Sequence, residues 1–170
     1  MKLNSILPLL LITNLSIAAR TCEDYITDNW PDSRYALETT LGDNVIRDNK
    51  TGLMWKQCSE GLSGSDCEIG SSTSHTWGQA LELANTTNYA GYSDWKIPNI
   101  KELRTITTKN CYQPSINETS FPNTPITWFW TSSPFAGFND SVWTIYFYEG
   151  DGYGVSRDDD YSVRLVRINE

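Results

Sequence analysis

The side chains best suited to chemistry are four cysteines and one histidine. The cysteines are Cys22, Cys58, Cys67 and Cys111, and the only histidine is His75. No Cys-x-x-Cys pair occurs, so the ligands of a zinc site and the motif of a thiol redox centre are missing. An even cysteine count instead predicts two disulfides, which form in oxidising compartments. Of the three connectivities, we favour Cys58–Cys67, which closes a short loop rich in serine and glycine, together with Cys22–Cys111.

Nucleophilic catalysis would have to use His75, because a Ser-His-Asp or Cys-His arrangement needs an imidazole base. His75 lies in a Ser/Thr-rich loop just before an expected helix cap, a position typical of an exposed structural histidine. The segment "EGDGYG" (149–154) follows an expected strand but does not lead into a helix, so it is not a phosphate loop. Paired carboxylates for glycoside hydrolysis stay an open alternative, since only the fold brings such pairs together. We predict that the chain is not an enzyme.

An acidic segment is the most suggestive polar feature of the sequence. Glu149, Asp151, Asp158, Asp159 and Asp160 supply hard oxygen ligands of the kind that calcium prefers. The Asp-x-Asp-x-Asp-Gly spacing of a calcium loop is absent, however, and consecutive aspartates project in different directions. A solvated hairpin tip is therefore the favoured interpretation. Calcium held by the four aspartates of this set is the weaker alternative, and we expect no other cofactor.

Aromatic residues provide the other candidate binding groups, with seven tryptophans and nine tyrosines in the chain. Aromatic side chains dominate interfaces because they combine a large apolar surface with a polar tip. Trp128 and Trp130 share one face of an expected strand, and Tyr148 and Tyr153 flank an expected turn. We predict a ligand-binding surface that contains Trp128, Trp130, Tyr148, Tyr153, Arg157 and Asp158.

The first residues are typical of a signal peptide, with Lys2 followed by a mostly apolar run over residues 6–15 and small residues near Ala18. The run is too short for a membrane span, which needs about 20 apolar residues. We therefore expect residues 1–18 to be removed, leaving an N-terminal arm (19–40) and one main domain (41–168). The product would be secreted, periplasmic or attached to the cell surface.

The charge balance narrows the class of partner. Removing Lys2 from the 13 basic residues leaves 12 against 21 acidic residues, which is a formal charge of −9. A chain this acidic repels phosphate backbones, so nucleic acid is excluded as a partner. The same balance opposes simple ion-exchange binding to sulfated polysaccharides or anionic lipid.

Two helices follow from capping signals. Thr76 with Gln79 and Asn99 with Glu102 both have the spacing of a capping box, and Pro98 disfavours helix just before the second cap. Apolar residues recur behind each cap at helical spacing. The buried faces are expected to contain Trp77, Ala80, Leu81 and Ala84 in the first helix, and Ile100, Leu103 and either Ile106 or Thr107 in the second.

The remaining segments read as strands and loops. Residues 45–57 form two strands around a turn that ends at Gly52, and residues 127–133 have strong β propensity. Residues 141–157 are expected to form a hairpin that turns at Glu149–Gly152, and residues 161–168 to form one final strand. Helices early and antiparallel strands late predict an α+β domain with long loops, stapled by disulfides.

Alternation in the hairpin separates two faces, Trp143, Ile145 and Phe147 on one and Thr144, Tyr146 and Tyr148 on the other. Most of the tryptophans outside the predicted binding surface are expected in the core: Trp55, Trp77, Trp95 and Trp143.

A series of motifs resembles the Lcl C-terminal domain family, whose namesake is a collagen-like adhesin. They appear in that family's order over about residues 41–168: "DNKTGLMWKQC" (48–58), "TWGQALELA" (76–84), "GYSDWKIPNIKEL" (91–103), "FPNTP" (121–125), "WTSSP" (130–134), "VWTIYFYEG" (142–150) and "VRLVR" (163–167).

The resemblance implies a C-type-lectin-like fold in which two helices pack around small antiparallel sheets and the N- and C-terminal strands pair. It also implies that Trp95 fills the core. The namesake adhesin binds sulfated glycosaminoglycans and assembles as a trimer, but this chain lacks a collagen-like stalk and the calcium-lectin motifs. An oxidase activity like that of the formylglycine-generating relatives would need free cysteines.

The leading hypothesis is a non-enzymatic, exported binding module, adhesin-like, that holds a glycan or a protein. An assembly subunit of a larger surface structure, including a homotrimer, is the alternative. A formylglycine-generating-like enzyme is the third.

Overall fold

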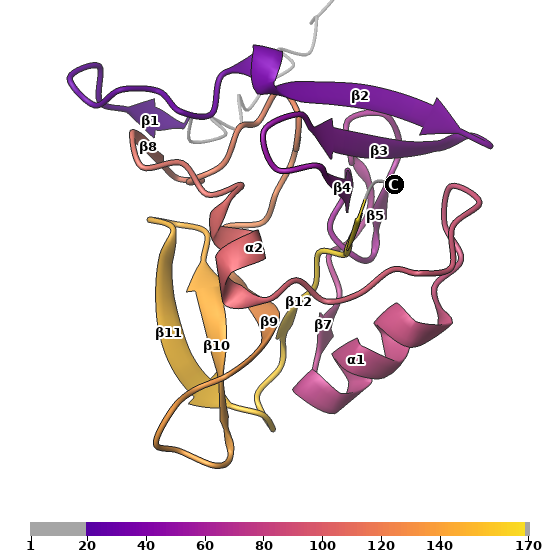
Figure 1. The fold of residues 1–170 in the computed structure, drawn as a ribbon, viewed down its shortest axis with the longest axis vertical. Helices are drawn as coiled ribbons and strands as arrows, with labels where there is room; N and C mark the ends of the chain where they lie inside the picture. Colours follow the sequence, from indigo (N-terminus) through magenta and orange to yellow (C-terminus); the bar gives the residue numbers. More distant parts are fainter. Residues whose placement is uncertain (1–19, 169–170) are drawn as a thin grey trace, which may run out of the picture.

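The computed structural model describes residues 20–168. The predicted signal peptide, residues 1–18, lies outside the described residues. Two helices and a series of mostly short strands make up the fold (Figure 1). The elements are β1 Thr21–Cys22, η1 Asp32–Arg34, β2 Tyr35–Thr40, β3 Asp43–Asp48, β4 Leu53–Lys56, β5 Leu62–Ser63, β6 Ile69–Gly70, β7 Ser74–His75, α1 Trp77–Thr86, α2 Ile100–Arg104, β8 Cys111–Tyr112, β9 Trp128–Pro134, β10 Ser141–Tyr146, β11 Asp151–Ser156, β12 Tyr161–Ser162 and β13 Val166–Ile168.

Two sheets carry most of the architecture. A five-stranded sheet has the order β11-β10-β9-β12-β7, and a four-stranded sheet has the order β13-β4-β3-β2. All neighbours are antiparallel except β12 and β9, which are parallel. Figure 1 shows β9, β10, β11 and β12 of the five-stranded sheet in orange and yellow and its edge strand β7 in magenta, with the strands of the four-stranded sheet in the upper part of the view. The α+β class and the small sheets predicted from the sequence are therefore confirmed.

The β3–β4 hairpin has the predicted turn. Gly52 adopts a φ of +72°, a left-handed conformation that glycine reaches without steric cost. The apolar run in β4 has no alternation because both faces of the hairpin are covered. Met54 belongs to one core cluster and the adjacent Trp55 to another, and Val45 and Ile46 divide in the same way.

Three predictions about strands are wrong in detail. Residues 161–168 do not form one strand, because β12 joins the five-stranded sheet while β13 joins the four-stranded sheet. The N- and C-terminal strands of the domain do not pair, since β13 pairs with β4 and β2 occupies the opposite edge. The β10–β11 turn covers residues 147–150 rather than Glu149–Gly152. In the first two cases long-range pairing, which local sequence does not encode, decides where a strand lies. In the third case the register of the hairpin, with Tyr146 opposite Asp151, places the turn two residues earlier than predicted.

Both capping boxes form as predicted. In α1 the Thr76 side chain accepts from Gln79 N–H, and in α2 the Asn99 side chain accepts from Glu102 N–H at 2.9 Å. In return, the Glu102 carboxylate accepts from Asn99 N–H at 2.7 Å. The predicted buried faces are only partly correct, since Leu81 is exposed and Trp77 and Ile100 are partly buried. Ala80 and Ala84 provide the buried positions of α1, and Leu103 provides that of α2.

Replacing the α2 cap, Asn99→Ala, should lower the free energy of unfolding by about 1 kcal/mol, because the Glu102 N–H loses its acceptor. Chemical denaturation of the purified domain measures this change. The control is Asn85→Ala, at an exposed position in α1, which should change stability by less than about 0.5 kcal/mol. Equal effects of the two substitutions would show that the cap does not stabilise α2.

The core consists of two clusters of buried residues, one on each face of the β3–β4 hairpin. Trp95, 3% exposed, packs in the first cluster with Trp130 and Leu165, and its indole N–H donates to Tyr89 O at 3.0 Å. The second cluster places Leu103 of α2 against Phe129 of β9. The prediction that Trp95 fills the core is therefore confirmed. Trp55 is also fully buried, whereas Trp77 and Trp143 are only partly buried.

Both predicted disulfides are present. Cys22–Cys111 joins β1 to β8 across 89 residues, and Cys58–Cys67 closes a loop of nine. The predicted N-terminal arm is thereby tied to the body at one end. Its other end is β2, which pairs with β3 along its whole length.

Neither helix within residues 20–168 has the length and apolar character needed to cross a membrane.

Candidate functional site

A row of aromatic side chains crosses the five-stranded sheet. Trp128 on β9 lies directly opposite Tyr146 on β10, and the two rings stack with their centroids 4.9 Å apart. Tyr148 stacks on Tyr146 at 5.8 Å, and Tyr112 of β8 continues the series 6.4 Å from Tyr148. Cross-strand aromatic pairs of this kind stabilise a sheet as well as forming a surface.

Trp128 is the centre of this surface. Tyr153 of β11 contacts it edge-on at 4.6 Å, and Tyr161 of β12 lies 5.9 Å away. Gly152 faces the other side of β11, where a Cβ atom would lie 2.9 Å from the end of the Arg104 side chain and 3.5 Å from Ile100 Cδ1, both of α2. The row therefore occupies the sheet face opposite α2. We use the name aromatic row for Tyr112, Tyr148, Tyr146, Trp128, Tyr153 and Tyr161.

The geometry determines what the row presents to solvent. Stacked rings cover one another's faces, so ring edges and tyrosine hydroxyls form much of the accessible surface. Tyr153 is 38% exposed, and its hydroxyl donates to Glu149, a hydrogen bond that raises the pKa of Tyr153. The Tyr161 hydroxyl donates to Asp159 at 3.3 Å, and burial raises the pKa of Tyr161. Both hydroxyls therefore stay protonated at neutral pH.

Trp130 does not belong to the accessible surface, contrary to the prediction. Its side chain is fully buried, packs against Tyr161 at 5.0 Å, and donates its indole N–H to His75 O. The prediction placed Trp130 on the correct strand face. Its end of that face is buried in the first core cluster, which includes Ala80 and Ala84 of α1, and the sequence does not reveal this arrangement.

Arg157 and Asp158 lie beyond the end of β11. The Arg157 guanidinium stacks over the ring of Trp77 at 4.7 Å, and its carbonyl accepts from Trp77 N–H. It therefore holds the start of α1 against the sheet. Asp158 is exposed, and its N–H donates to Ser156 Oγ. Within residues 20–168, neither residue makes a hydrogen bond, an ion pair or a cation–π contact with the aromatic row.

The calcium alternative is not supported. No group of three or more histidine, cysteine, aspartate or glutamate side chains within the described part of the chain is arranged to hold a metal ion. Asp151 instead pairs with Lys109 at 3.3 Å. Asp158, Asp159 and Asp160 are exposed, but they lie in the connection between β11 and β12, two strands that do not pair, rather than at a hairpin tip.

Three members of the row were missed by the sequence prediction: Tyr146, Tyr161 and Tyr112. Tyr146 had a usable signal, because it alternates with Thr144 and Tyr148 on one strand face. Tyr161 and Tyr112 had none, since each reaches the row from a strand that is distant in the sequence.

The cysteines and the histidine have structural partners. All four cysteines are disulfide-bonded, so no thiol is available in this state. The His75 ring contacts Thr73 Oγ1 at 2.9 Å, and its carbonyl holds Trp130.

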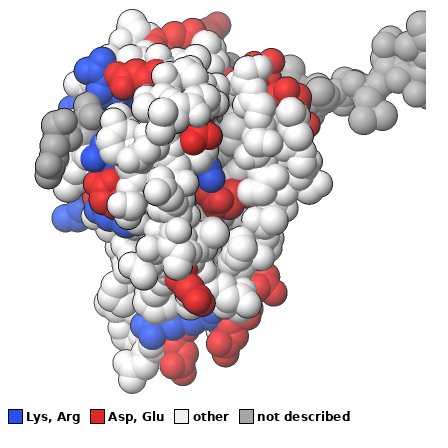
Figure 2. Space-filling view, turned by 90° about the vertical axis from the view of Figure 1, so that its right-hand side faces the viewer, with Lys and Arg blue, Asp and Glu red and all other residues white. Residues whose placement is uncertain are grey.

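Charge is mixed over the face shown in Figure 2, where acidic and basic side chains are interspersed and no broad basic area appears. The aromatic row itself is flanked by carboxylates, since Glu149 and Asp159 contact two of its hydroxyls. This surface is electrostatically unsuited to a sulfated or phosphorylated ligand.

Comparison with known proteins supports the motif-based resemblance. No curated protein matches this chain. The family model of the Lcl C-terminal domain matches residues 44–167. This span contains every strand from β4 to β12, both helices and all six residues of the aromatic row. The chain therefore belongs to the Lcl C-terminal domain family.

Proposed function

We propose that this chain is a non-enzymatic binding module whose aromatic row contacts a glycan or a protein. The observation that carries the proposal is the position of Trp128, which is only partly buried although Tyr146, Tyr153 and Tyr161 surround it. Such a surface offers ring edges for apolar contact and hydroxyls for hydrogen bonds. Because carboxylates flank it, we propose a neutral ligand and expect binding to depend only weakly on salt.

The proposal includes an exported location, secreted, periplasmic or at the cell surface, and a C-type-lectin-like fold. Two disulfides support export, because they persist in oxidising compartments. Two short helices among small sheets support the lectin-like fold. The absence of a free thiol in this state supports a non-enzymatic role, because oxidase chemistry of the formylglycine-generating kind would need reactive cysteines.

The test is binding of the mature domain to a glycan array, with and without calcium and at two salt concentrations. Trp128→Ala should weaken a selective interaction by about tenfold or more, the loss typical of a central aromatic contact. Tyr153→Phe tests the exposed hydroxyl alone, because it keeps the ring against Trp128.

The matched control is Phe138→Ala. Phe138 is 64% exposed and belongs to the same sheet region, but it contacts Phe135 rather than the row. A blank array would direct the search to a protein ligand. Binding to either class that survives Trp128→Ala and Tyr153→Phe would contradict the proposed surface.

A further inference from the structure

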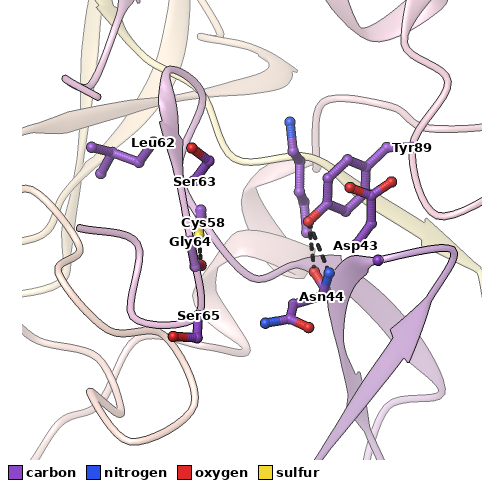
Figure 3. A pocket seen from close by; sticks show the side chains of 10 residues that line it. Asp43, Asn44, Cys58, Leu62, Ser63, Gly64, Ser65 and Tyr89 are labelled. Carbon is purple, nitrogen blue, oxygen red and sulfur yellow. Dashed lines mark hydrogen bonds between the residues drawn. The ribbon is translucent and has the colours of Figure 1, made fainter. Parts of the chain in front are cut away.

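A cleft of about 440 Å³ lies on a different part of the molecule, between the β2–β3 turn and the loop closed by Cys58–Cys67. Figure 3 shows Asp43, Asn44 and Tyr89 on one wall and Ser63 to Ser65 on the other. Its volume falls within the range of small-ligand pockets. None of its residues belongs to the aromatic row.

The first wall is fixed by hydrogen bonds. The Tyr89 hydroxyl donates to Asn44 O at 2.9 Å and accepts from Asn44 N–H at 3.1 Å, so ring and turn are locked together (Figure 3). Burial, reinforced by the charge of Asp43, raises the pKa of Tyr89 to about 12, which keeps this hydroxyl protonated. The Asn44 amide is held between Thr39 and Gln57.

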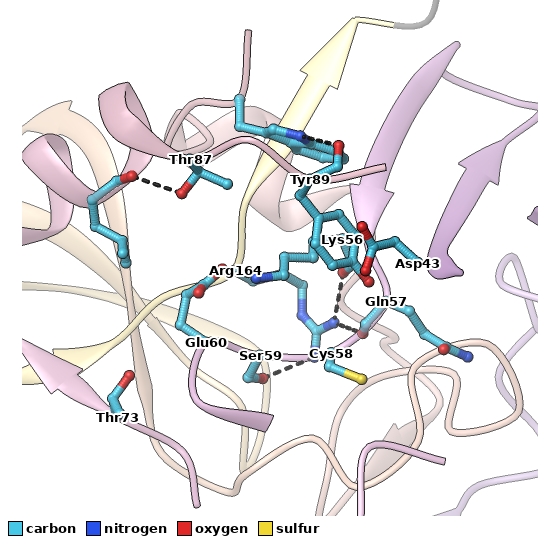
Figure 4. A network of polar contacts seen from close by, with 12 residues as sticks. Asp43, Lys56, Gln57, Cys58, Ser59, Glu60, Thr73, Thr87, Tyr89 and Arg164 are labelled. Atoms are coloured by element: carbon cyan, nitrogen blue, oxygen red, sulfur yellow. Dashed lines mark hydrogen bonds and ion pairs between the residues drawn. The ribbon is translucent and has the colours of Figure 1, made fainter. Parts of the chain in front are cut away.

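A buried cation, the guanidinium of Arg164, holds the backbone beside the cleft. Arg164, 1% exposed, donates to the carbonyls of Lys56 and Gln57 and to Ser59 Oγ (Figure 4). Burial lowers the pKa of Arg164 to about 9, and the charge of Glu60 opposes this shift, so the guanidinium is charged at neutral pH. These bonds fix the backbone between β4 and the disulfide loop, so that the cleft is preformed.

The charge of the cleft selects among ligands. Lys56 is already paired with Glu60 at 2.8 Å, and its ammonium lies 4.6 Å from the centre of the Tyr89 ring. Asp43 accepts from Ala90 N–H, and no cation pairs with its carboxylate among residues 20–168. The cleft therefore has one carboxylate without a cationic partner, that of Asp43, and this negative charge disfavours an anionic ligand.

The other side chains that line the cleft provide both hydroxyl groups and apolar surface. Ser65 makes no side-chain hydrogen bond within the described chain, and Ser63 Oγ has only a contact of 3.5 Å to Ile69 O. Leu62 and the ring of Tyr89 add apolar surface to these hydroxyls and to the Asp43 acceptor. Alternating apolar and hydrogen-bonding surface of this kind matches a molecule that carries C–H and O–H groups on one small ring.

From this geometry we infer that the cleft is a second binding site, separate from the aromatic row, for a neutral, hydroxyl-rich ligand the size of one sugar residue. Asp43 accepts hydrogen bonds from ligand hydroxyls, Ser63 and Ser65 bond the opposite side, and Tyr89 packs along the ring.

The experiment is titration of the mature domain, followed by NMR chemical shifts, with glucose, galactose, mannose and N-acetylglucosamine. Glucuronate and glucosamine serve as the anionic and cationic comparisons. At least one neutral sugar should shift signals of residues 42–44 and 62–65, and glucuronate should bind at least tenfold more weakly.

Asp43→Asn should weaken the interaction by at least tenfold, because the amide oxygen can keep the Ala90 bond while the charged acceptor is lost. Ser65→Ala tests the opposite side, and Asp151→Asn is the exposed control. An unchanged thermal unfolding midpoint for each variant verifies folding. Absence of shifts in the cleft with every neutral sugar, preferential binding of a charged sugar, or equal affinity of Asp43→Asn and wild type would each overturn the inference.

The two sites are tested separately. Trp128→Ala should leave cleft binding unchanged, and Asp43→Asn should leave binding at the aromatic row unchanged. Failure of either proposal therefore does not decide the other.

Discussion

Removing the Cys22–Cys111 disulfide with a double serine substitution should cost more stability than removing Cys58–Cys67. The first bridge constrains a segment of 89 residues and the second a segment of nine. In the chain-entropy account, these loop lengths correspond to a loss of roughly 4.6 kcal/mol for Cys22–Cys111 and roughly 2.6 kcal/mol for Cys58–Cys67. The reason is that the longer loop gains more conformations in the unfolded chain when its bridge is lost.

Urea denaturation followed by tryptophan fluorescence measures both double variants against wild type. The other contacts of the arm remain in the first variant, since Trp30 still donates its indole N–H to Thr105 O and Glu23 N–H donates to Asn110 O. If the two variants lost equal stability, or if the short loop cost more, the entropic account would not hold for this domain.

Asp48→Ala should lower the free energy of unfolding by about 3–5 kcal/mol, because it leaves the buried Arg34 guanidinium without its carboxylate. The Arg34 and Asp48 side chains are 7% and 0% exposed, and Arg34 Nε donates to Asp48 Oδ1 at 2.8 Å. Asp48 also accepts from Lys50 N–H and Thr51 Oγ1, so the turn between β3 and β4 would lose its anchor as well.

Replacing both partners with apolar residues, Arg34→Met with Asp48→Leu, is the informative comparison. This double variant should recover much of the lost stability, because no unpaired charge stays buried. Thermal and urea unfolding report the difference. A double variant less stable than Asp48→Ala would indicate that the hydrogen bonds to the turn, rather than the charge, dominate.

The same carboxylate gives the domain a pH dependence. Burial alone would raise the pKa of Asp48, but hydrogen bonds from Arg34, Thr51 and Lys50 N–H outweigh it and hold the pKa below its ordinary value. The contribution of Asp48 is therefore complete above the unfolded-chain pKa of about 3.9 and is lost as the pH falls through the lower, folded value. The stability difference between wild type and Asp48→Asn should shrink below about pH 4. A difference that stays constant into that range would contradict this assignment.

Local signals predicted the parts of this fold that local chemistry controls. The caps at Thr76 and Asn99 were predicted correctly because a capping box needs only residues three apart. Gly52 identified the β3–β4 turn for the same reason. The disulfide pairing was predictable because one short loop accounted for two of the four cysteines.

The binding surface was only partly predictable. Trp128 and Tyr153 were identified by residue type and strand position, and the structure brings them into contact. Trp130 was assigned to the same surface because it shares a strand face with Trp128, but its end of that face is buried in the first core cluster, which includes Ala80 and Ala84 of α1. Strand alternation determines which face a side chain occupies, not which end of that face other elements bury.

The sequence by itself determined the helices, the β3–β4 turn, the Cys58–Cys67 disulfide and the family of this protein, because each depends on residues that are close together or on motifs in a fixed order. The Cys22–Cys111 pairing followed because these were the two cysteines left. Only the tertiary structure decided that β12 and β13 enter different sheets, that Tyr161 and Tyr112 join the aromatic row, and that Asp43 faces Ser65 across a cleft. These arrangements unite segments distant in the chain. Their positions follow from how the two core clusters pack, which no local pattern specifies.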